Sequence, residues 1–189
     1  MSASVDTILQ HEKVPDPTIV TPRLRLRPPR PDDLDFMHWL HLSQEATRWT
    51  PSIRSKSLPD TEKRLAMMLS EHPPLVHMLV VELLPTTDRP EPFPIGTAGS
   101  FRPAELGYGF HQDYFGKGYG TEAALAYCHW FRAQYPGERM IGKTFPENLA
   151  SVRVLEKCGF TAAREGERED WPLDQGGGGT WIDRTGDVK

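Results

Sequence analysis

Three glycines at alternating positions, Gly116, Gly118 and Gly120, run directly into a helical pattern, and they restrict the fold more than any other feature. Glycine has no Cβ, so the chain can turn tightly and direct successive backbone N–H groups toward one point. That point lies at the positive end of the following helix, where apolar residues recur at helical spacing through 123–131. The segment predicts a cradle for a phosphate, although glycines also serve as ordinary turn residues.

The residues before this loop alternate as a β-strand does. In the run 105–110 the apolar side chains fall on one side, and Gly107 and Gly109 fall on the other. A strand face without side chains admits a close neighbour. Strand, loop and helix follow one another without a gap, and the glycine spacing fits neither the Walker pattern nor the dinucleotide fingerprint.

A second segment, residues 148–160, reads NLASVRVLEKCGF and combines an Asn helix start with a Gly stop. Together with YFGKGYGTEA at 114–123 and TPRLRLRP at 21–28, it resembles the GNAT superfamily of acetyl-coenzyme A-dependent N-acetyltransferases. The particular resemblance is to the ribosomal-protein N-terminal (Rim-type) acetyltransferase branch. It covers about residues 19–163, with the three motifs in the family's order.

The resemblance implies an α/β (α+β) fold with a mixed, mostly antiparallel, splayed central sheet of six to seven strands and about four helices. We expect a flexible N-terminal arm at 1–18, a single N-acetyltransferase domain at 19–183 and a tail at 184–189. A chain of 189 residues suits one domain. The expected strands lie near 22–28, 76–84, 94–102, 105–110, 139–145, 160–165 and 180–183, and the expected helices near 32–41, 57–71, after 118, and 148–158.

The family's phosphate motif falls on Phe115, Gly118 and Gly120, with Phe115 standing where relatives carry Gln or Arg. By resemblance, acetyl-coenzyme A enters a gap between the glycine strand and the 139–145 strand as a co-substrate. The residues expected to hold it are Phe110, Gln112, Phe115, Gly116, Lys117, Gly118, Tyr119, Gly120, Thr121, Asn148 and Ser151. Asn148 also fits a plain N-cap, and the two roles can coexist.

The implied chemistry is direct attack of an amine on the thioester carbonyl in a ternary complex, with a strand N–H near Phe110 as the oxyanion donor. An ammonium group must first lose a proton, so a base is needed. The resemblance favours Glu105, with Asp113 and His111 as alternatives.

A leaving thiolate also needs an acid. Many relatives have a Tyr in the segment aligned with Leu155, and leucine cannot donate a proton. The catalytic role of acid then falls to Ser151, Tyr108 or water. We therefore expect an N-acetyltransferase acting on a protein N-terminus, a peptide or a small-molecule amine. The alternative is a catalytically weak acyl-coenzyme A binding or sensing module.

Composition narrows the partners. The formal net charge of −4 argues against a nucleic-acid partner, for which a basic patch would be expected, and no run approaches the ~18 apolar residues that span a membrane. The first residues lack a secretory signal pattern, so we expect a cytoplasmic protein, as a monomer or homodimer. Cys128 and Cys158 fit reduced core cysteines, and the seven histidines show no metal-ligand spacing, so no metal is expected.

Overall fold

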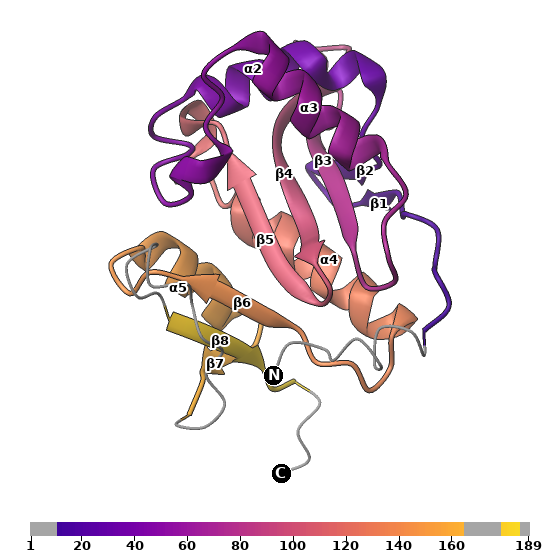
Figure 1. Cartoon of the computed structure of the whole chain (residues 1–189), viewed down its shortest axis with the longest axis vertical. Coiled ribbons are helices and arrows are strands. Elements are labelled where there is room, and N and C mark those ends of the chain that lie inside the picture. The colour runs from indigo at the N-terminus through magenta and orange to yellow at the C-terminus, as the bar shows by residue number, and fades with distance from the viewer. Residues whose placement is uncertain (1–10, 165–178, 186–189) are drawn as a thin grey trace.

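The computed structural model describes residues 11–164 and 179–185. Within them the chain forms one open sheet flanked by helices (Figure 1). The strands are β1 (Ile19–Val20), β2 (Leu24–Arg27), β3 (His77–Leu83), β4 (Phe93–Arg102), β5 (Glu105–Phe110), β6 (Ile141–Thr144), β7 (Phe160–Ala162) and β8 (Gly179–Asp183). The helices are α2 (Leu34–Leu42), α3 (Leu58–Leu69), α4 (Tyr119–Gln134) and α5 (Leu149–Lys157), with short 3-10 turns η1 (Pro31–Asp33), η2 (Pro51–Ile53) and η3 (Gln112–Tyr114).

The sheet has the order β1-β2-β3-β4-β5-β6-β8-β7, and its pairs are antiparallel except for β5 with β6. The predicted mixed, mostly antiparallel sheet with four helices is confirmed. The described residues contain eight strands rather than six to seven. The additional strand is β1, whose two residues pair with Leu26 and Arg25 of β2. A two-residue strand beside Pro15 and Pro17 has no alternation that a sequence pattern can detect.

The two faces of the sheet are covered by different helix pairs. On β3, Leu79 and Val81 join a core cluster that contains residues of α4 and α5, whereas Val80 packs with residues of α2 and α3. Because side chains alternate along a strand, these clusters lie on opposite faces. Figure 1 shows α4 and α5 behind the sheet and α2 and α3 on the other side.

The sheet is splayed between β5 and β6. The parallel register consists of Glu105 with Ile141 and Leu106 with Gly142, and no further pair follows. Beyond this point the two strands diverge in Figure 1. We call the gap between β6 and the unpaired stretch of β5, from Gly107 to Phe110, the split. This confirms the splayed sheet expected from the resemblance.

A buried ion-pair network fixes the entry to α2. Arg27 is buried and donates to both carboxylate oxygens of Asp33, at 2.9 and 2.7 Å, and to Oε1 of Glu82 at 2.6 Å. Arg25 donates to Oε2 of Glu82 at 2.8 Å. Burial alone would lower the pKa of Arg27, but the hydrogen bonds with the two carboxylates outweigh it, so its pKa is raised. The network joins β2, β3 and η1.

Residues 11–18, part of the segment expected to be a flexible arm, lie against the domain. Asp16 Oδ1 is 2.7 Å from Nδ1 of the fully buried His77, whose Nε2 is 2.8 Å from the Tyr135 hydroxyl. Residues 1–10 lie outside the described part, as do most of the expected tail and the glycine run near 176–178. None of the helices in the described part is long and apolar enough to cross a bilayer.

Candidate active site

The glycine-rich loop, residues 115–121, joins η3 to α4 at one end of the split. Gly116 and Gly118 have φ values of +72° and +81°, which side chains rarely adopt. Gly118 is the N-cap of the 16-residue helix α4, and no side chain caps it. Among the described residues, the N–H groups of Tyr119, Gly120 and Thr121 donate no hydrogen bond. Three free donors at the positive end of a helix suit an anion.

The glycines of the loop differ in what a side chain would meet. A Cβ on Gly120 would lie 3.7 Å from the Phe110 ring, which is ordinary contact. At Gly118 a Cβ would approach Arg23 at 3.4 Å in addition to the unfavourable φ. Gly118 is therefore required by the backbone, whereas Gly120 leaves room for a methyl group.

The TPRL segment, residues 21–24 at the start of β2, holds this loop through hydrogen bonds. Arg23 Nε donates to Glu122 Oε2 at 2.7 Å, and Arg23 Nη1 donates to the Lys117 carbonyl at 3.0 Å. The Thr21 hydroxyl donates to Glu122 Oε1 at 2.6 Å. Burial alone would raise the pKa of Glu122, but the hydrogen bonds from Thr21 and Arg23 outweigh it and lower the pKa. The Glu122 charge is thus paired and anchors the loop to β2.

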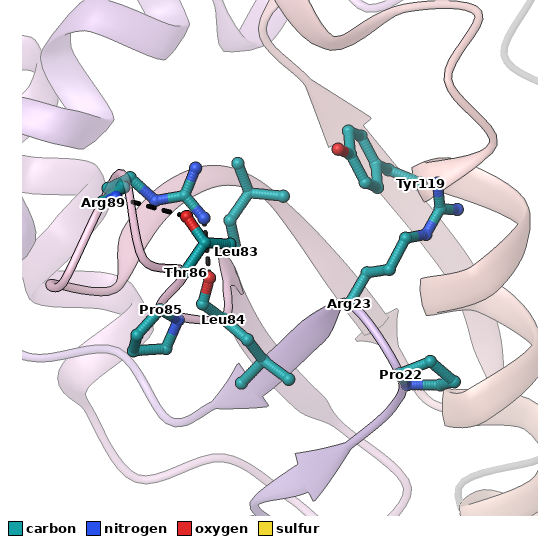
Figure 2. Close-up of a pocket in the computed structure, with 8 residues that line it drawn as sticks. All are labelled: Pro22, Arg23, Leu83, Leu84, Pro85, Thr86, Arg89 and Tyr119. Carbon is teal, nitrogen blue, oxygen red and sulfur yellow. Dashed lines mark hydrogen bonds between the residues drawn. The ribbon is translucent and has the colours of Figure 1, made fainter.

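A groove of about 240 Å³ adjoins the loop on the β2 side. Figure 2 shows Arg23 and Tyr119 on one wall and the β3–β4 connection on the other. The Arg23 guanidinium lies 4.6 Å from the centre of the Tyr119 ring. On the facing wall Arg89 donates to the Leu84 carbonyl at 2.6 Å. Arg89 therefore adds positive charge to this side of the loop, whereas the charge of Arg23 is paired with Glu122.

The hydrogen-bond pattern of β5 directs backbone groups into the split. The bond from His111 N to Ile95 O makes Phe110 and Gly96 a non-hydrogen-bonded pair of the β4–β5 ladder. In such a pair the N–H and C=O groups point away from the partner strand, and the pattern repeats every second residue. Tyr108 and Phe110 thus present their N–H and C=O groups to the β6 side, where the register has already ended at Leu106. An extended ligand with amide groups could pair with them.

The α5 side of the split is closed by Tyr108 and the first turn of α5. The Tyr108 hydroxyl donates to the Ser151 carbonyl at 3.2 Å, and burial raises the pKa of Tyr108. Asn148 is buried, and its Oδ1 caps α5 by accepting from Ser151 N at 3.3 Å. Leu155, one turn further along, is buried in the core.

On the α2/α3 face the split is bounded by aromatic side chains. A Cβ on Gly109 would meet nothing within 4 Å, whereas a Cβ on Gly107 would collide with the Phe101 ring. At the open end Trp49, in the loop before η2, lies 5.9 Å from the Phe145 ring that follows β6. The α2–α3 connection therefore reaches across the split to the β6 side of the sheet. It leaves open space above Gly109.

The end of α2 is also fixed to the residues that follow β5. Trp39 stacks on His111, with ring centroids 3.5 Å apart, and the Ser43 hydroxyl donates to Oε1 of Gln112. These contacts hold α2 over the open end of the split.

The closed end of the split carries an ion pair on the α2/α3 face. Lys143 Nζ lies 3.0 Å from Glu105 Oε2, and the two side chains are only 14% and 17% exposed. Exposed Arg102 approaches the other oxygen of Glu105 at 3.4 Å. Glu105, the expected base, is therefore already paired with a lysine.

Comparison with known proteins fixes the family. A profile described as "Acetyltransferase (GNAT) domain" matches residues 23–161, more than half of the 189 residues. The chain belongs to the GNAT acetyltransferase family.

Individual relatives agree with this GNAT assignment. YnaD, an uncharacterized N-acetyltransferase of Bacillus subtilis (strain 168), is 39% identical over 62 residues, 33% of this chain and 35% of YnaD. The match thus spans about a third of that relative's length. An acetyltransferase from Agrobacterium tumefaciens str. C58 superimposes with a TM-score of 0.67 and 22% identity, covering 91% of this chain and 96% of that chain.

The ribosomal L7/L12 alpha-N-protein acetyltransferase RimL, in complex with coenzyme A, has a TM-score of 0.64 and 17% identity, covering 86% of this chain and 94% of that chain. At these identities the likeness is one of fold.

The GNAT fold gathers the expected coenzyme residues around the split, but not all of their side chains point to it. Phe115 is half exposed at the loop, and a Cβ on Gly120 would lie 3.7 Å from the Phe110 ring. Lys117 turns back, with Nζ donating to the Asp113 carbonyl at 2.8 Å. The Gln112 side chain accepts from Ser43, and the Gln112 carbonyl accepts from Phe115 N at 3.0 Å, so its N–H is the main-chain group left for a ligand.

Four residues with a part in this GNAT site were not singled out from the sequence: Thr21, Arg23, Lys143 and Phe145. The TPRL segment was used for the resemblance, but no local pattern indicates that it lies beneath the loop. Lys143 and Phe145 end a predicted strand, and their partners come from distant segments. In the described part of the chain, no group of three or more His, Cys, Asp or Glu side chains could hold a metal ion.

Proposed function

We propose that this GNAT domain transfers an acetyl group from acetyl-coenzyme A to a primary amine by direct attack in a ternary complex. The observation that carries the proposal is the continuity of free backbone donors. The N–H groups of residues 119–121 lie at one end, and those of Phe110 and Tyr108 line the split that leads away from them. A diphosphate at the loop and an amide-bearing arm in the split would use both sets.

The residues around the loop suit the coenzyme. Gly116 and Gly118 leave no Cβ above the loop, and Arg89 adds positive charge beside it. RimL, which shares this fold, forms a complex with coenzyme A. When bound, the coenzyme supplies an activated thioester, and the chain holds it and aligns an acceptor.

The backbone of β5 is the proposed oxyanion donor. Tyr108 N–H is the first group on the split side beyond the paired register, so it is nearest to the closed end. A fixed N–H at that point would stabilise negative charge on a carbonyl oxygen without reorganisation. The sequence favoured a donor near Phe110. The end of the register moves the proposal two residues along the strand.

Glu105 is the proposed base and Tyr108 the proposed acid. Glu105 shares the α2/α3 face with Gly109, so an amine entering above that glycine approaches the same side of the sheet. The Tyr108 hydroxyl is near the first turn of α5, and its raised pKa keeps the proton on the oxygen at neutral pH. Ser151, which contributes its carbonyl to the same hydrogen bond, is the alternative donor.

The acceptor is proposed to be a protein N-terminus, a peptide or a small-molecule amine. RimL is an alpha-N-protein acetyltransferase of ribosomal L7/L12, and the Rim-type resemblance favours the first of these. A Cβ on Gly109 would meet nothing within 4 Å, and on the same face the Phe101 ring lies beside Gly107, which suits an acceptor with an apolar side chain next to its amine.

A catalytically weak acyl-coenzyme A binding module is the second candidate, favoured by buried Leu155 and by the pairing of Glu105 with Lys143. Thiol release from acetyl-coenzyme A, measured with a panel of N-terminal peptides and polyamines, separates the two. Turnover with any amine supports the transferase. Tight binding by calorimetry without turnover supports the binding module, and absence of binding contradicts both. Glu105→Gln should lower the rate most at low pH, and a flat profile would remove Glu105 as the base.

A further inference from the structure

Lys143 presents an amine at the closed end of the split, on the face from which an acceptor would attack. A Cβ built on Gly142 would point to Leu155 of α5. The next residue, Lys143, therefore faces the opposite side of β6. This is the side of Gly109 and Glu105. Lys143 is also the first residue of β6 beyond the paired register.

The thioester end of the coenzyme reaches this point if the proposed function holds. The phosphates lie at the loop that follows the open end, and the arm runs along Phe110 and Tyr108 toward the closed end. The unpaired stretch of β5 is four residues, or about 13 Å at the rise of a strand. An extended arm that fills it places its reacting end beside Leu106 and Lys143.

The geometry points to Lys143 as a site of self-acetylation, an inference that rests on the proposed function. Its ammonium is 3.0 Å from the carboxylate of the proposed base, and both side chains are largely shielded from solvent. Lys143 is thus an amine already held in the relation to Glu105 that an external acceptor would have to reach. Holding two reacting groups in one structure raises their effective concentration by many orders of magnitude.

The step balances without a further reactant. The Lys143 ammonium gives one proton to Glu105, and the neutral Nζ attacks the thioester carbonyl carbon. The carbon–sulfur bond breaks, the thiolate takes the second nitrogen proton, and Glu105 returns its proton to solvent. The products are Nε-acetyl-lysine at 143, free coenzyme A and one proton.

Acetylation would change the site it occurs in. An acetylated lysine is neutral and cannot pair with a carboxylate. Glu105 would lose its partner at 3.0 Å, and the α2/α3 face would lose one positive charge. An external amine arrives as a cation, so the modified site attracts it more strongly and offers it the Glu105 oxygen that Lys143 had occupied, while exposed Arg102 still approaches the other oxygen at 3.4 Å. Self-acetylation would therefore raise the rate of transfer to external amines.

Other lysines of the chain provide matched controls. Lys117 and Lys157 are exposed, whereas Lys143 is largely buried. Spontaneous acetylation in solution would modify the exposed lysines first. Preference for Lys143 therefore distinguishes transfer within the site from random chemistry.

The test incubates the full chain with acetyl-coenzyme A and no acceptor, and follows each lysine by peptide mass spectrometry. We expect Lys143 to be acetylated at least about tenfold faster than Lys117 or Lys157, with the difference abolished by excess free coenzyme A and by Gly118→Val. Lys143→Gln, which resembles the acetylated state, should lower KM for a cationic amine relative to Lys143→Arg, which keeps the charge.

The inference and the proposed function fail in different ways. If external amines are acetylated while Lys143 stays unmodified, or is modified no faster than the exposed lysines, self-acetylation is wrong and the transferase stands. If coenzyme A does not bind, measured by calorimetry on the same protein, both are wrong. Equal KM values for Lys143→Gln and Lys143→Arg would contradict the proposed effect on external acceptors.

Discussion

The two sides of the split are built by different means. The proposed coenzyme side, formed by the glycine-rich loop, the free edge of β5 and the start of α5, offers mainly backbone groups. The proposed acceptor side, on the α2/α3 face, is formed by side chains from four separate segments, among them Trp49, Phe101 and Lys143. Backbone groups do not depend on residue type. On the coenzyme side the sequence therefore controls only how open these backbone groups are to a ligand and how firmly neighbouring residues hold them. On the acceptor side each side chain matters individually.

This difference predicts which substitutions separate coenzyme binding from acceptor use. Changes at the glycines or beneath the loop should weaken coenzyme binding whatever the acceptor. Changes on the acceptor side should alter KM for the amine and leave the coenzyme affinity unchanged. The following variants test the distinction, beginning with the largest expected effect.

Gly118→Val should lower coenzyme affinity by about a hundredfold, equivalent to losing one or two hydrogen bonds to a charged group. A branched side chain at φ +81° displaces the loop and covers the free N–H groups. Calorimetric titration with coenzyme A measures the loss. Gly120→Ala is the control, because its Cβ would make only ordinary contact with Phe110 at 3.7 Å. Equal affinities in the two variants would show that the loop is not the phosphate site.

Arg23→Ala should lower coenzyme affinity about tenfold and the free energy of unfolding by about 1 kcal/mol, because Glu122 and the Lys117 carbonyl lose a half-exposed partner. Arg25→Ala is the matched control on the same strand. Arg25 also pairs with a carboxylate, Glu82, but does not touch the loop. It should destabilise the fold and leave coenzyme binding intact. A similar loss of affinity in both variants would make the support of the loop nonspecific.

The ion pair between Arg23 and Glu122 also makes the stability of the fold depend on pH. The pKa of Glu122 is lowered in the folded state, so its contribution to stability is complete above the ordinary carboxylate pKa and is lost as the pH falls through the lowered value. Urea unfolding between neutral and acidic pH should show a steeper loss for the wild type than for Arg23→Ala.

Tyr108→Phe should reduce kcat about tenfold while changing coenzyme affinity little, since the backbone of β5 is retained. The free energy of unfolding should fall by about 1 kcal/mol, the value of one hydrogen bond to the Ser151 carbonyl. Stopped-flow thiol release gives the rate. An unchanged kcat would assign the acid to Ser151 or water.

Gly109→Ala should have the smallest effect and the sharpest selectivity. Its Cβ enters open space on the acceptor side and meets nothing within 4 Å, so stability should change by less than about 0.5 kcal/mol. We expect KM for the amine to rise a few-fold and coenzyme affinity to stay the same. Weaker coenzyme binding would mean that the two sides are not independent.

Much of the coenzyme side could be read from the sequence because it depends on local patterns. The glycine spacing, the alternation of β5 and the Asn148 cap are each contained in a few consecutive residues, and the structure agrees with all three. Ser57 likewise marks the start of α3, where its hydroxyl accepts from Asp60 N. Local backbone requirements limit the residue types, which makes them visible in one sequence.

The remainder depends on contacts between distant segments. Glu122 fits a favourable charge at a helix start, and only the fold reveals that Thr21 and Arg23 hold it. The pairs Lys143–Glu105 and Trp49–Phe145 are likewise created by the splayed sheet. β1 was missed for a different reason, since two residues are too few to form a pattern.

Two register pairs and the ion pair between Glu105 and Lys143 join β5 to β6, so the sheet is only weakly hydrogen-bonded along its middle. A molecule bound between β5 and β6 would link the two strands. It would complete hydrogen bonds that the chain leaves open at Tyr108 and Phe110. The amide hydrogens of Tyr108 and Phe110 should then exchange with solvent more slowly once coenzyme A is added. The coenzyme would thereby order both strands before the amine binds. This favours an ordered sequence in which the coenzyme binds first.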